Sequence, residues 1–326
     1  MAVTLHAPSA TASTESHADW LELRSLLADD FSSSLTDLVR ALRPTGTIEE
    51  VLEEQIGGED ASPAQLSDPG DDMSEAVADS ASSELDDREF ACGGPVASGG
   101  AYPFVRGAQY LQSSPEAVRA VYVFLLLLST QGIAAGPAGL IATELFEDVA
   151  AAAAASYFGA DGHGVGIYQF GFPRRRTLPG FKPAINELCS RLAEGGGARD
   201  RPDSRHQKDA KLDLVVWRPF PDARMGKVVA FGQCAAGNDW RDKLSEMQPR
   251  TFTSAWMTHP LGLEPTRLFF CPFRVERDRW ETTVLSSGVL FDRCRIALHC
   301  ANLSGELADK CQQFSAHVLE QQLVHA

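Results

Sequence analysis

The feature that most constrains the fold is a pair of short apolar segments separated by a stretch rich in turn formers. The segments cover residues 211–217 (KLDLVVW) and 227–235 (KVVAFGQCA), with residues 218–226 (RPFPDARMG) between them. Short runs rich in β-branched and aromatic residues predict strands, and the intervening Pro, Asp and Gly predict a turn. The sequence therefore predicts a hairpin that brings Asp213, near the start of one strand, beside Gln233, near the end of the other.

Asp213 is an unusual residue for such a strand, because it stands between Leu212 and Leu214. A carboxylate among apolar side chains is costly unless it is paired or holds a metal. Carboxylate and amide oxygens are ligands that hard cations accept, so the hairpin predicts a cation site. Two simpler interpretations stay open: Asp213 as a structural acid paired with Lys211 or an arginine, and Gln233 as a partner for backbone groups at the sheet edge.

The negative charge of the chain is concentrated in its N-terminal third. The 326 residues carry 29 Lys and Arg against 44 Asp and Glu, a net charge of −15. Residues 1–100 contain 4 basic and 21 acidic residues, whereas residues 171–227 contain 13 basic and 7 acidic ones. Because phosphate binding depends on local charge, the acidic overall composition does not exclude a nucleic-acid ligand.

The cysteines and the apolar runs bear on the cellular compartment. The seven cysteines are scattered and form no CxxC pair, so a structural zinc site is not expected. The first residues lack the pattern of a signal peptide, and the longest apolar run, residues 118–128, is too short to span a bilayer. We therefore expect a cytoplasmic protein with reduced thiols and no membrane partner.

The pattern of apolar residues divides the chain into four regions. Residues 1–56 show helical spacing, with a break near Ser32–Ser34, and residues 57–84 are rich in Asp, Gly, Ser, Pro and Ala. Such a composition buries little apolar surface, so it predicts an acidic, disordered linker. The linker is interpreted as a solubilising tether or as an acidic segment that covers a basic face. Residues 85–135 are predicted to form a helical subdomain that packs on the core, and residues 136–326 an α/β domain.

Within the α/β domain, a helix carrying Phe146-Glu147 is followed by a strand, then by the segment Leu212-Asp213-Leu214, then by Phe231-Gly232-Gln233-Cys234, then by a helix. This order resembles the PD-(D/E)XK restriction-endonuclease-like superfamily over roughly residues 136–300. The Mrr-like branch, in which glutamine often replaces the second acid, is the nearest. The resemblance implies a restriction-endonuclease-like central mixed sheet flanked by helices, behind the helical acidic N-terminal region.

The resemblance also implies roles for individual residues. Asp213 is the expected principal Mg²⁺ ligand, Gln233 the second, and Glu147 the helix carboxylate, with Glu144 one turn earlier as its alternative. The family has a lysine two residues after the second ligand, but Ala235 occupies that position. Lys243, in the first turn of the next predicted helix, is the expected replacement, because helical side chains lean toward the helix start.

These residues together predict a Mg²⁺-dependent nuclease, with Mn²⁺ as an alternative cation. A divalent cation activates water and stabilises the charge that develops during phosphodiester hydrolysis. DNA is the favoured substrate, with RNA as the alternative. The resemblance implies an effector of an anti-phage or foreign-DNA defence system. The chain lacks a Walker A pattern, so separate ATPase or targeting subunits are the expected partners. The expected contacts to the nucleic-acid backbone are basic side chains: Arg174, Arg175, Arg176, Arg205, Lys208 and Lys211.

Two other functions are compatible with the sequence. With Gln at position 233 and Ala at position 235, the domain could be an inactive nuclease relic that binds nucleic acid or a partner protein. Gly232-Gln233-Cys234 also echoes cysteine hydrolases, although the remaining elements of their motifs are missing. A buried cysteine is commonly a small apolar residue, so Cys234 is the weaker candidate for a catalytic group.

Overall fold

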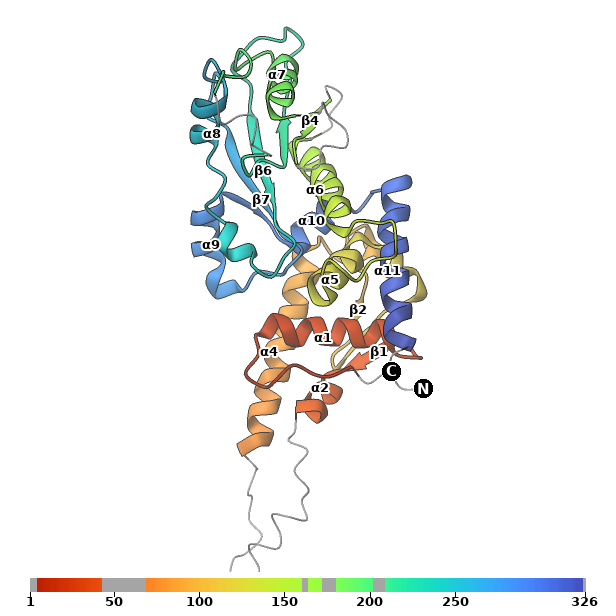
Figure 1. The fold of residues 1–326 in the computed structure, drawn as a ribbon. Coiled ribbons are helices and arrows are strands. Elements are labelled where there is room, and N and C mark those ends of the chain that lie inside the picture. The colour runs from red at the N-terminus through yellow and green to blue at the C-terminus, as the bar shows by residue number, and fades with distance from the viewer. Residues whose placement is uncertain (1–4, 43–68, 160–163, 172–179, 202–208, 325–326) are drawn as a thin grey trace, which may run out of the picture. The chain divides into compact units, whose positions relative to one another are not determined.

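The computed structural model describes residues 5–42, 69–159, 164–171, 180–201 and 209–324. The protein is a mixed α/β structure (Figure 1). It divides into two compact units, which are described separately. Unit 1 consists of residues 1–88, 104–115 and 322–326, and unit 2 of residues 89–103 and 116–321. Among the described residues, no helix is both long enough and apolar enough to cross a membrane.

Unit 1 combines helices with a small antiparallel sheet. Its first helix, α1 (Thr14–Leu27), is separated by β1 (Ser32–Ser34) from α2 (Leu35–Leu42), so the predicted break at the serines is confirmed. The strands β2 (Val105–Arg106) and β3 (Tyr110–Gln112) complete the sheet in the order β1-β3-β2. Segments from two distant parts of the chain therefore build this unit together.

The predicted linker at residues 57–84 is wrong over its described part. Residues 57–68 lie outside the described residues, but Pro69–Ala91 form helix α4. Ala78, Ala81 and Leu85 are buried at helical spacing. The composition of this segment is misleading because alanines bury little area individually, yet their small size lets a helix pack closely.

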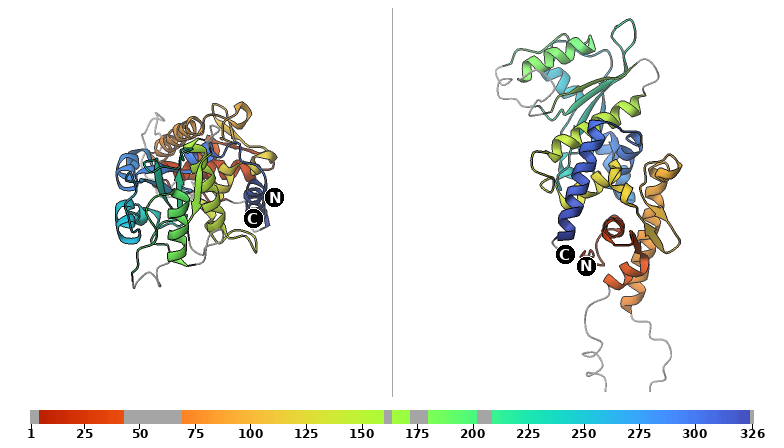
Figure 2. Two further views of the ribbon diagram at one scale, coloured as in Figure 1. Left: turned by 90° about the horizontal axis from the view of Figure 1, so that it is seen from above. Right: turned by 90° about the vertical axis from the view of Figure 1, so that its right-hand side faces the viewer.

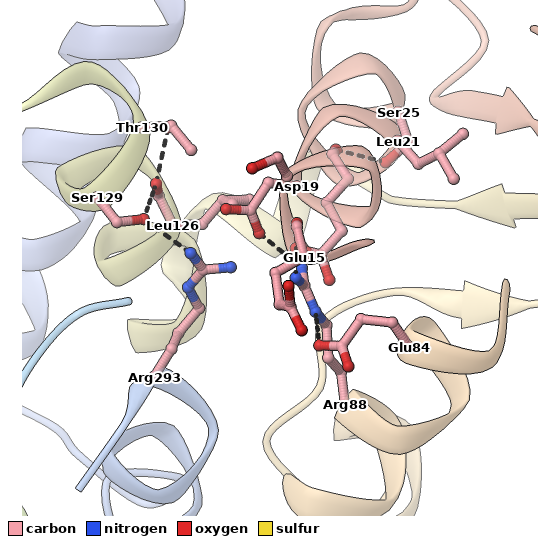
Figure 3. A network of polar contacts seen from close by, with 12 residues as sticks. Glu15, Asp19, Leu21, Ser25, Glu84, Arg88, Leu126, Ser129, Thr130 and Arg293 are labelled. Carbon is pink, nitrogen blue, oxygen red and sulfur yellow. Dashed lines mark hydrogen bonds and ion pairs between the residues drawn. The ribbon is translucent and has the colours of Figure 1, made fainter. Parts of the chain in front are cut away.

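One buried cation organises the acidic residues of unit 1 (Figure 3). Arg88 of α4 is fully buried. It donates hydrogen bonds to Asp19 (2.7 Å), to Glu22 (2.8 Å) and to Glu84 (2.8 Å), and to the backbone oxygen of Glu15 at 2.9 Å. The carboxylates of α1 and α4 are thus held by a guanidinium, whose fork of donors matches several oxygen partners.

Unit 2 contains a five-stranded open sheet in the order β4-β5-β6-β7-β8. Strands β4, β5 and β6 are antiparallel, whereas β7 and β8 run parallel to β6. The predicted hairpin is confirmed, because β5 pairs with β6 through Leu214 opposite Gly232 and Trp217 opposite Val229. The bounds of the strands are Gly166–Gln169 (β4), Leu214–Trp217 (β5), Val229–Cys234 (β6), Thr266–Phe270 (β7) and Val289–Phe291 (β8).

Helices and short 3-10 turns connect these strands. The α-helices are α5 (Val121–Gln131), α6 (Ala142–Phe158), α7 (Phe181–Leu192), α8 (Pro249–Trp256), α9 (Trp280–Ser287), α10 (Arg293–His299) and α11 (Glu306–Val324). The 3-10 helices are η1 (Val96–Ser98), η2 (Pro115–Arg119), η4 (Trp240–Lys243) and η5 (Arg277–Arg279). Strand β8 is short, because helix α9 extends as far as Ser287, two residues before it.

The two faces of the sheet are covered by different helices (Figure 2). Val215 of β5 and Phe231 of β6 point into a core formed with α7 and α8, where Phe252 contacts the ring of Phe231. Because side chains alternate along a strand, Leu214 and Gly232 belong to the opposite face, and helix α6 packs against β4, β5 and β6. The strands β5 and β6 are therefore covered on one face by α7 and α8 and on the other by α6.

The predicted subdomain at residues 85–135 is not a separate unit. Residues 104–115 belong to unit 1, because β3 pairs with β1, whereas residues 116–135 belong to unit 2. In unit 2, α5 is buried along almost its whole length, and its Phe124 packs edge-on against Phe314 of α11. The buried Arg293 of α10 donates to Ser129 of α5 at 2.7 Å (Figure 3). The predicted helix is real, but its packing joins it to the α/β domain.

Candidate metal and active site

A strained turn leads into β5 and determines where Asp213 lies. Ala210 and Lys211 both have left-handed backbone conformations, with φ of 53° and 68°. The Leu212 N–H donates to the backbone oxygen of Asp209 at 3.2 Å, and the Lys211 N–H donates to the Asp209 side chain at 2.9 Å. Two consecutive non-glycine residues with positive φ are costly, so the surrounding contacts must hold this turn in place.

Asp213 connects the three antiparallel strands. Its backbone oxygen accepts hydrogen bonds from the N–H groups of Phe170 (2.7 Å) and Gly171 (2.9 Å), at the end of β4. Its N–H donates to the backbone oxygen of Gly232, and its Oδ2 accepts from the Cys234 N–H at 2.7 Å. The carboxylate therefore lies against the last residue of β6, where the sequence predicted the two arms of the hairpin to meet.

Glu147 of α6 reaches the same end of the sheet. A Cβ atom placed on Gly171 would stand 2.9 Å from Glu147 Oε2 and 3.4 Å from Oε1. Any larger residue at position 171 would therefore displace this carboxylate, so the glycine leaves it the room it occupies. Because the Gly171 N–H also donates to the backbone oxygen of Asp213, the structure brings Glu147 and Asp213 near one another, as the family resemblance implies.

The two carboxylates affect each other's environment. Burial raises the pKa of Asp213 well above 3.8, and the charges of Glu147 and Asp209 raise it further. The hydrogen bond from Cys234 and the charge of Lys211 act in the opposite direction without offsetting these effects. A buried carboxyl group whose pKa is raised by burial and by a second acid is typical of functional sites, where a cation or a shared proton relieves the repulsion.

Gln233 has different contacts from those expected. It is 4% exposed, and its Nε2 donates to Glu246 Oε2 at 2.9 Å. Within the described part of the chain, its Oε1 has no hydrogen-bond partner. Along β6 its side chain shares the face of Phe231 rather than that of Gly232 and Cys234. Its immediate partner is therefore Glu246, a residue that the sequence analysis did not single out.

The two candidate lysines and Ala235 are also placed. Lys243, in η4, forms an ion pair with Asp239 at 3.0 Å, and Lys211 forms one with Glu246 at 3.1 Å. Ala235, at the position where the family has its lysine, is buried in a small core that contains Trp240 and Phe269. Of the two lysines, Lys211 is the one whose charge acts on Asp213.

The remaining basic residues predicted to contact nucleic acid cannot be placed. The segments 172–179 and 202–208 lie outside the described residues, and they contain Arg174, Arg175, Arg176, Arg205 and Lys208. The predicted roles of these five residues therefore stay predictions.

The donor set is incomplete as a metal site. Across the described ranges, no group of three or more His, Cys, Asp or Glu residues is arranged to hold a metal ion. The oxygens that the structure brings together are the carboxylates of Glu147 and Asp213, whereas the unpartnered Oε1 of Gln233 belongs to the face of Phe231. An all-oxygen set of this kind suits Mg²⁺, which keeps several of its waters, so the chemistry of the donors fits a hydrated cation.

Cys234 does not have the environment of a nucleophile. Burial, followed by the charges of Asp213 and Glu147, raises the pKa of its thiol well above 9.0. A cysteine nucleophile needs a lowered pKa and hence a positive environment. The cysteine-hydrolase interpretation is therefore disfavoured.

The chain matches no family model, and comparisons with curated proteins and with solved structures find no similar protein. The site must accordingly be judged on its own residues.

Glu246 was missed because it follows a 3-10 helix, with no periodic pattern to show which side it faces. Gly171 could have been noticed, since it stands three residues before the basic run that begins at Arg174.

Proposed function

We propose that the protein is a Mg²⁺-dependent nuclease of the restriction-endonuclease-like type, with DNA as its substrate and Mn²⁺ as an alternative cation. The observation that carries this proposal is the pair of carboxylates, Glu147 and Asp213, at the end of the β5–β6 hairpin. Supporting it, the order α6, β4, β5, β6, β7, with the first three strands antiparallel, agrees with the arrangement that the sequence resemblance implies.

The electrostatics of the pair support a cation rather than an isolated acid. The charge of Glu147 raises the pKa of Asp213, so the pair is destabilised when both groups are ionised. A divalent cation would favour both ionised forms, and when bound it would lower the pKa of a water molecule and stabilise charge on the phosphate. Asp213 and Glu147 would hold the cation, and the Cys234 N–H keeps the Asp213 carboxylate in position.

Lys211 is the described residue best suited to act on a phosphate near this pair. Its side chain is about half exposed, its charge acts on Asp213, and its neighbour Ala210 shares the left-handed turn. The basic residues predicted from the sequence in segments 172–179 and 202–208 are further candidates for contacts with a nucleic-acid backbone. A role in defence against foreign DNA, with separate ATPase or targeting subunits, rests on family analogy alone.

The decisive experiment compares the wild type with Asp213→Ala and with Asp222→Ala, an exposed aspartate in the β5–β6 turn. Each protein is incubated with supercoiled plasmid, single-stranded DNA and RNA, in Mg²⁺, Mn²⁺ or EDTA. We expect cleavage that requires the cation, is lost in Asp213→Ala and is retained in Asp222→Ala. Cleavage that survives Asp213→Ala, or an absence of cleavage in every condition, would contradict the proposal.

The second candidate function is a nuclease-like domain that only binds nucleic acid or a partner protein. It is favoured by Ala235, which is buried among apolar side chains where the family has its lysine, and by the ion pair that engages Lys243. In this case the protein would retard labelled DNA or RNA in a gel equally with Mg²⁺ or EDTA. Asp213→Ala would leave that binding unchanged.

A further inference from the structure

A tryptophan with an arginine over its ring lies where helices α7 and α8 meet the segment 197–201. Trp256, the last residue of α8, packs against the core on this face of the sheet but stays partly exposed. The guanidinium carbon of Arg201 lies 5.0 Å from the centre of its indole ring. The ring of Phe181, at the start of α7, meets the indole edge-on with 4.8 Å between the ring centroids. Partly exposed aromatic rings among basic side chains are typical of surfaces that bind unpaired nucleotides.

The backbone beside Trp256 is held in a fixed arrangement. Ala198 and Met257 form an antiparallel bridge, and the Arg199 N–H donates to the backbone oxygen of Trp256 at 2.8 Å. The exposed side chain of Arg199 donates from Nε (3.1 Å) and from Nη2 (3.0 Å) to the backbone oxygen of Met257. A neutral oxygen therefore positions this guanidinium, and its charge is left to attract an anion.

The charges around Trp256 favour an anionic partner. Lys182, in the first turn of α7, pairs with Asp200 at 2.8 Å, and both side chains are exposed. Because exposed ion pairs are weak, a phosphate can compete with Asp200 for the lysine. Three basic side chains stand here against one acid, which gives these four residues a net charge of +2 in a chain whose net charge is −15. The Trp256 surface is defined as Lys182, Arg199, Arg201 and Trp256.

We propose that the Trp256 surface binds a single strand of nucleic acid. An unpaired base stacks on the Arg201–Trp256 pair, because indole and guanidinium groups both stack on the face of a base. The backbone phosphates bond to Arg199, whose fixed guanidinium suits phosphate oxygens, and to Lys182. Bases within a duplex are covered by their neighbours, so this mode of binding selects unpaired nucleotides. The inference goes beyond the proposed function, because it requires neither the cation nor Asp213 and it specifies which form of nucleic acid is bound.

The test measures the binding of labelled probes in EDTA by fluorescence anisotropy, at several salt concentrations. The probes are oligodeoxythymidine, oligouridine of the same length, a DNA duplex, and an abasic single strand that keeps the phosphates but lacks bases. The full-length variants are Trp256→Leu, Trp256→Phe and Arg199→Gln. The first control is Trp280→Leu, which removes a partly exposed tryptophan that also lies beneath an arginine, Arg295, at 4.5 Å. The second is Arg224→Gln, which removes an exposed arginine of the β5–β6 turn.

The tryptophan and arginine variants should change binding in different ways. Trp256→Leu should weaken the binding of oligodeoxythymidine by about 5–150-fold, the effect of losing one stacked base, with an unchanged salt dependence. Trp256→Phe keeps a flat ring and should bind more tightly than Trp256→Leu. Arg199→Gln removes one phosphate contact, so the slope of log K against log salt should decrease in magnitude by about 0.7. Both controls should match the wild type, and Trp256→Leu should bind the duplex and the abasic strand as the wild type does.

Thermal unfolding shows whether each variant is folded. A selective loss with oligodeoxythymidine or with oligouridine supports the inference and identifies the strand as DNA or RNA. Equal affinity of the wild type and Trp256→Leu for both probes would overturn it, as would an equal loss with the abasic strand, which would assign the surface to charge alone. If Trp256→Leu does not fold, an unchanged salt dependence in Arg199→Gln overturns the inference.

Two further outcomes separate this inference from its alternatives. Tighter binding of labelled polyglutamate than of either oligonucleotide would assign the Trp256 surface to an acidic protein partner and overturn the inference. Selective binding of a single strand with no cleavage by any protein would support the inference and overturn the proposed nuclease activity. Cleavage that depends on Asp213, with no effect of Trp256→Leu on the binding of either oligonucleotide, would support the nuclease and overturn the inference.

Discussion

Two groups of buried acids in this protein have opposite electrostatic environments. In unit 1, Glu22 and Glu84 surround the fully buried Arg88, which donates a hydrogen bond to each of them. In unit 2, Asp213 lies close to Glu147, and burial and that second charge raise its pKa. The first arrangement neutralises acids within the fold, whereas the second keeps them at an energetic disadvantage.

The difference indicates which acids serve stability and which serve a ligand. Buried charges with a full set of partners are retained for the structure, and removing one partner is costly. Acids that destabilise each other are retained only when something outside the fold compensates for them. The contrast predicts that substitutions in the two groups will change stability in opposite directions.

The largest expected effect is that of Arg88→Met. This change leaves Glu22 and Glu84 buried without their cation, which should lower the free energy of unfolding by about 3–5 kcal/mol. Arg40→Met is the matched control, because Arg40 is exposed and pairs with Asp37 at the surface, where such pairs contribute at most about 1 kcal/mol. Urea titrations followed by circular dichroism measure both, and equal effects would contradict the assigned role of Arg88.

The next effect is that of the cation on the acids of unit 2. If Asp213 and Glu147 bind Mg²⁺, a concentration of 100 times the dissociation constant should stabilise the wild type by about 2.7 kcal/mol. The Asp213→Asn variant should show no such gain, and its melting temperature should be the same in Mg²⁺ and in EDTA. Equal stabilisation of both proteins by Mg²⁺ would place the cation elsewhere.

Without metal, Asp213→Asn should stabilise the protein rather than destabilise it. The folded-state pKa of Asp213 is raised above its ordinary value of 3.8. The contribution of Asp213 to the free energy of unfolding is therefore complete below pH 3.8 and is lost as the pH rises through the folded-state pKa. The advantage of the asparagine should therefore be smallest near pH 4 and grow to about 1 kcal/mol or more at pH 8, at about 1.4 kcal/mol per unit of pKa shift. Urea midpoints at four pH values in EDTA measure it.

Glu147→Gln examines the coupling between the two acids. Removing its charge eliminates one cause of the raised pKa of Asp213, so that pKa should fall toward 3.8 while burial still holds it above. Carboxyl carbon chemical shifts of labelled aspartate, followed against pH, report the change. An identical pKa of Asp213 in the wild type and in Glu147→Gln would mean that the two carboxylates do not interact.

The smallest expected effect is that of Cys234→Ser. The thiol is kept protonated by burial and by the neighbouring acids, so a metal-dependent nuclease should keep its cleavage rate to within about threefold, as expected for a side chain that takes no part in proton transfer. The rate of plasmid cleavage measures this. Complete loss of activity in a folded variant would reopen the cysteine-hydrolase interpretation.

Much of the framework around the site was predictable from local pattern. The hairpin of β5 and β6 follows from the apolar segments and the turn residues between them, and the structure has it where the sequence predicted. The approach of Glu147 to Asp213 was predicted only through the family resemblance. Periodicity identifies the helix that carries Glu147, but not which sheet edge the carboxylate reaches.

The missed features depend on packing rather than on pattern. Helix α4 is acidic and rich in alanine, so its composition suggested disorder, and the burial of Ala81 and Arg88 becomes evident only with the partner helix α1. Residues 104–115 belong to unit 1 because β3 pairs with β1. This long-range contact leaves no local pattern in the sequence. Glu246 lies in an irregular segment, where no period shows its direction.

The discontinuity of unit 1 bears on how the gene can be dissected. Because β1 pairs with Tyr110–Gln112, a fragment that ends at residue 88 would lack the central strand of its own small sheet. A fragment that starts at residue 89 would carry strands β2 and β3 with exposed edges, which invite aggregation. Deletion of the acidic N-terminal third is therefore a poor way to isolate the site, and point substitutions in the intact polypeptide are the sounder approach.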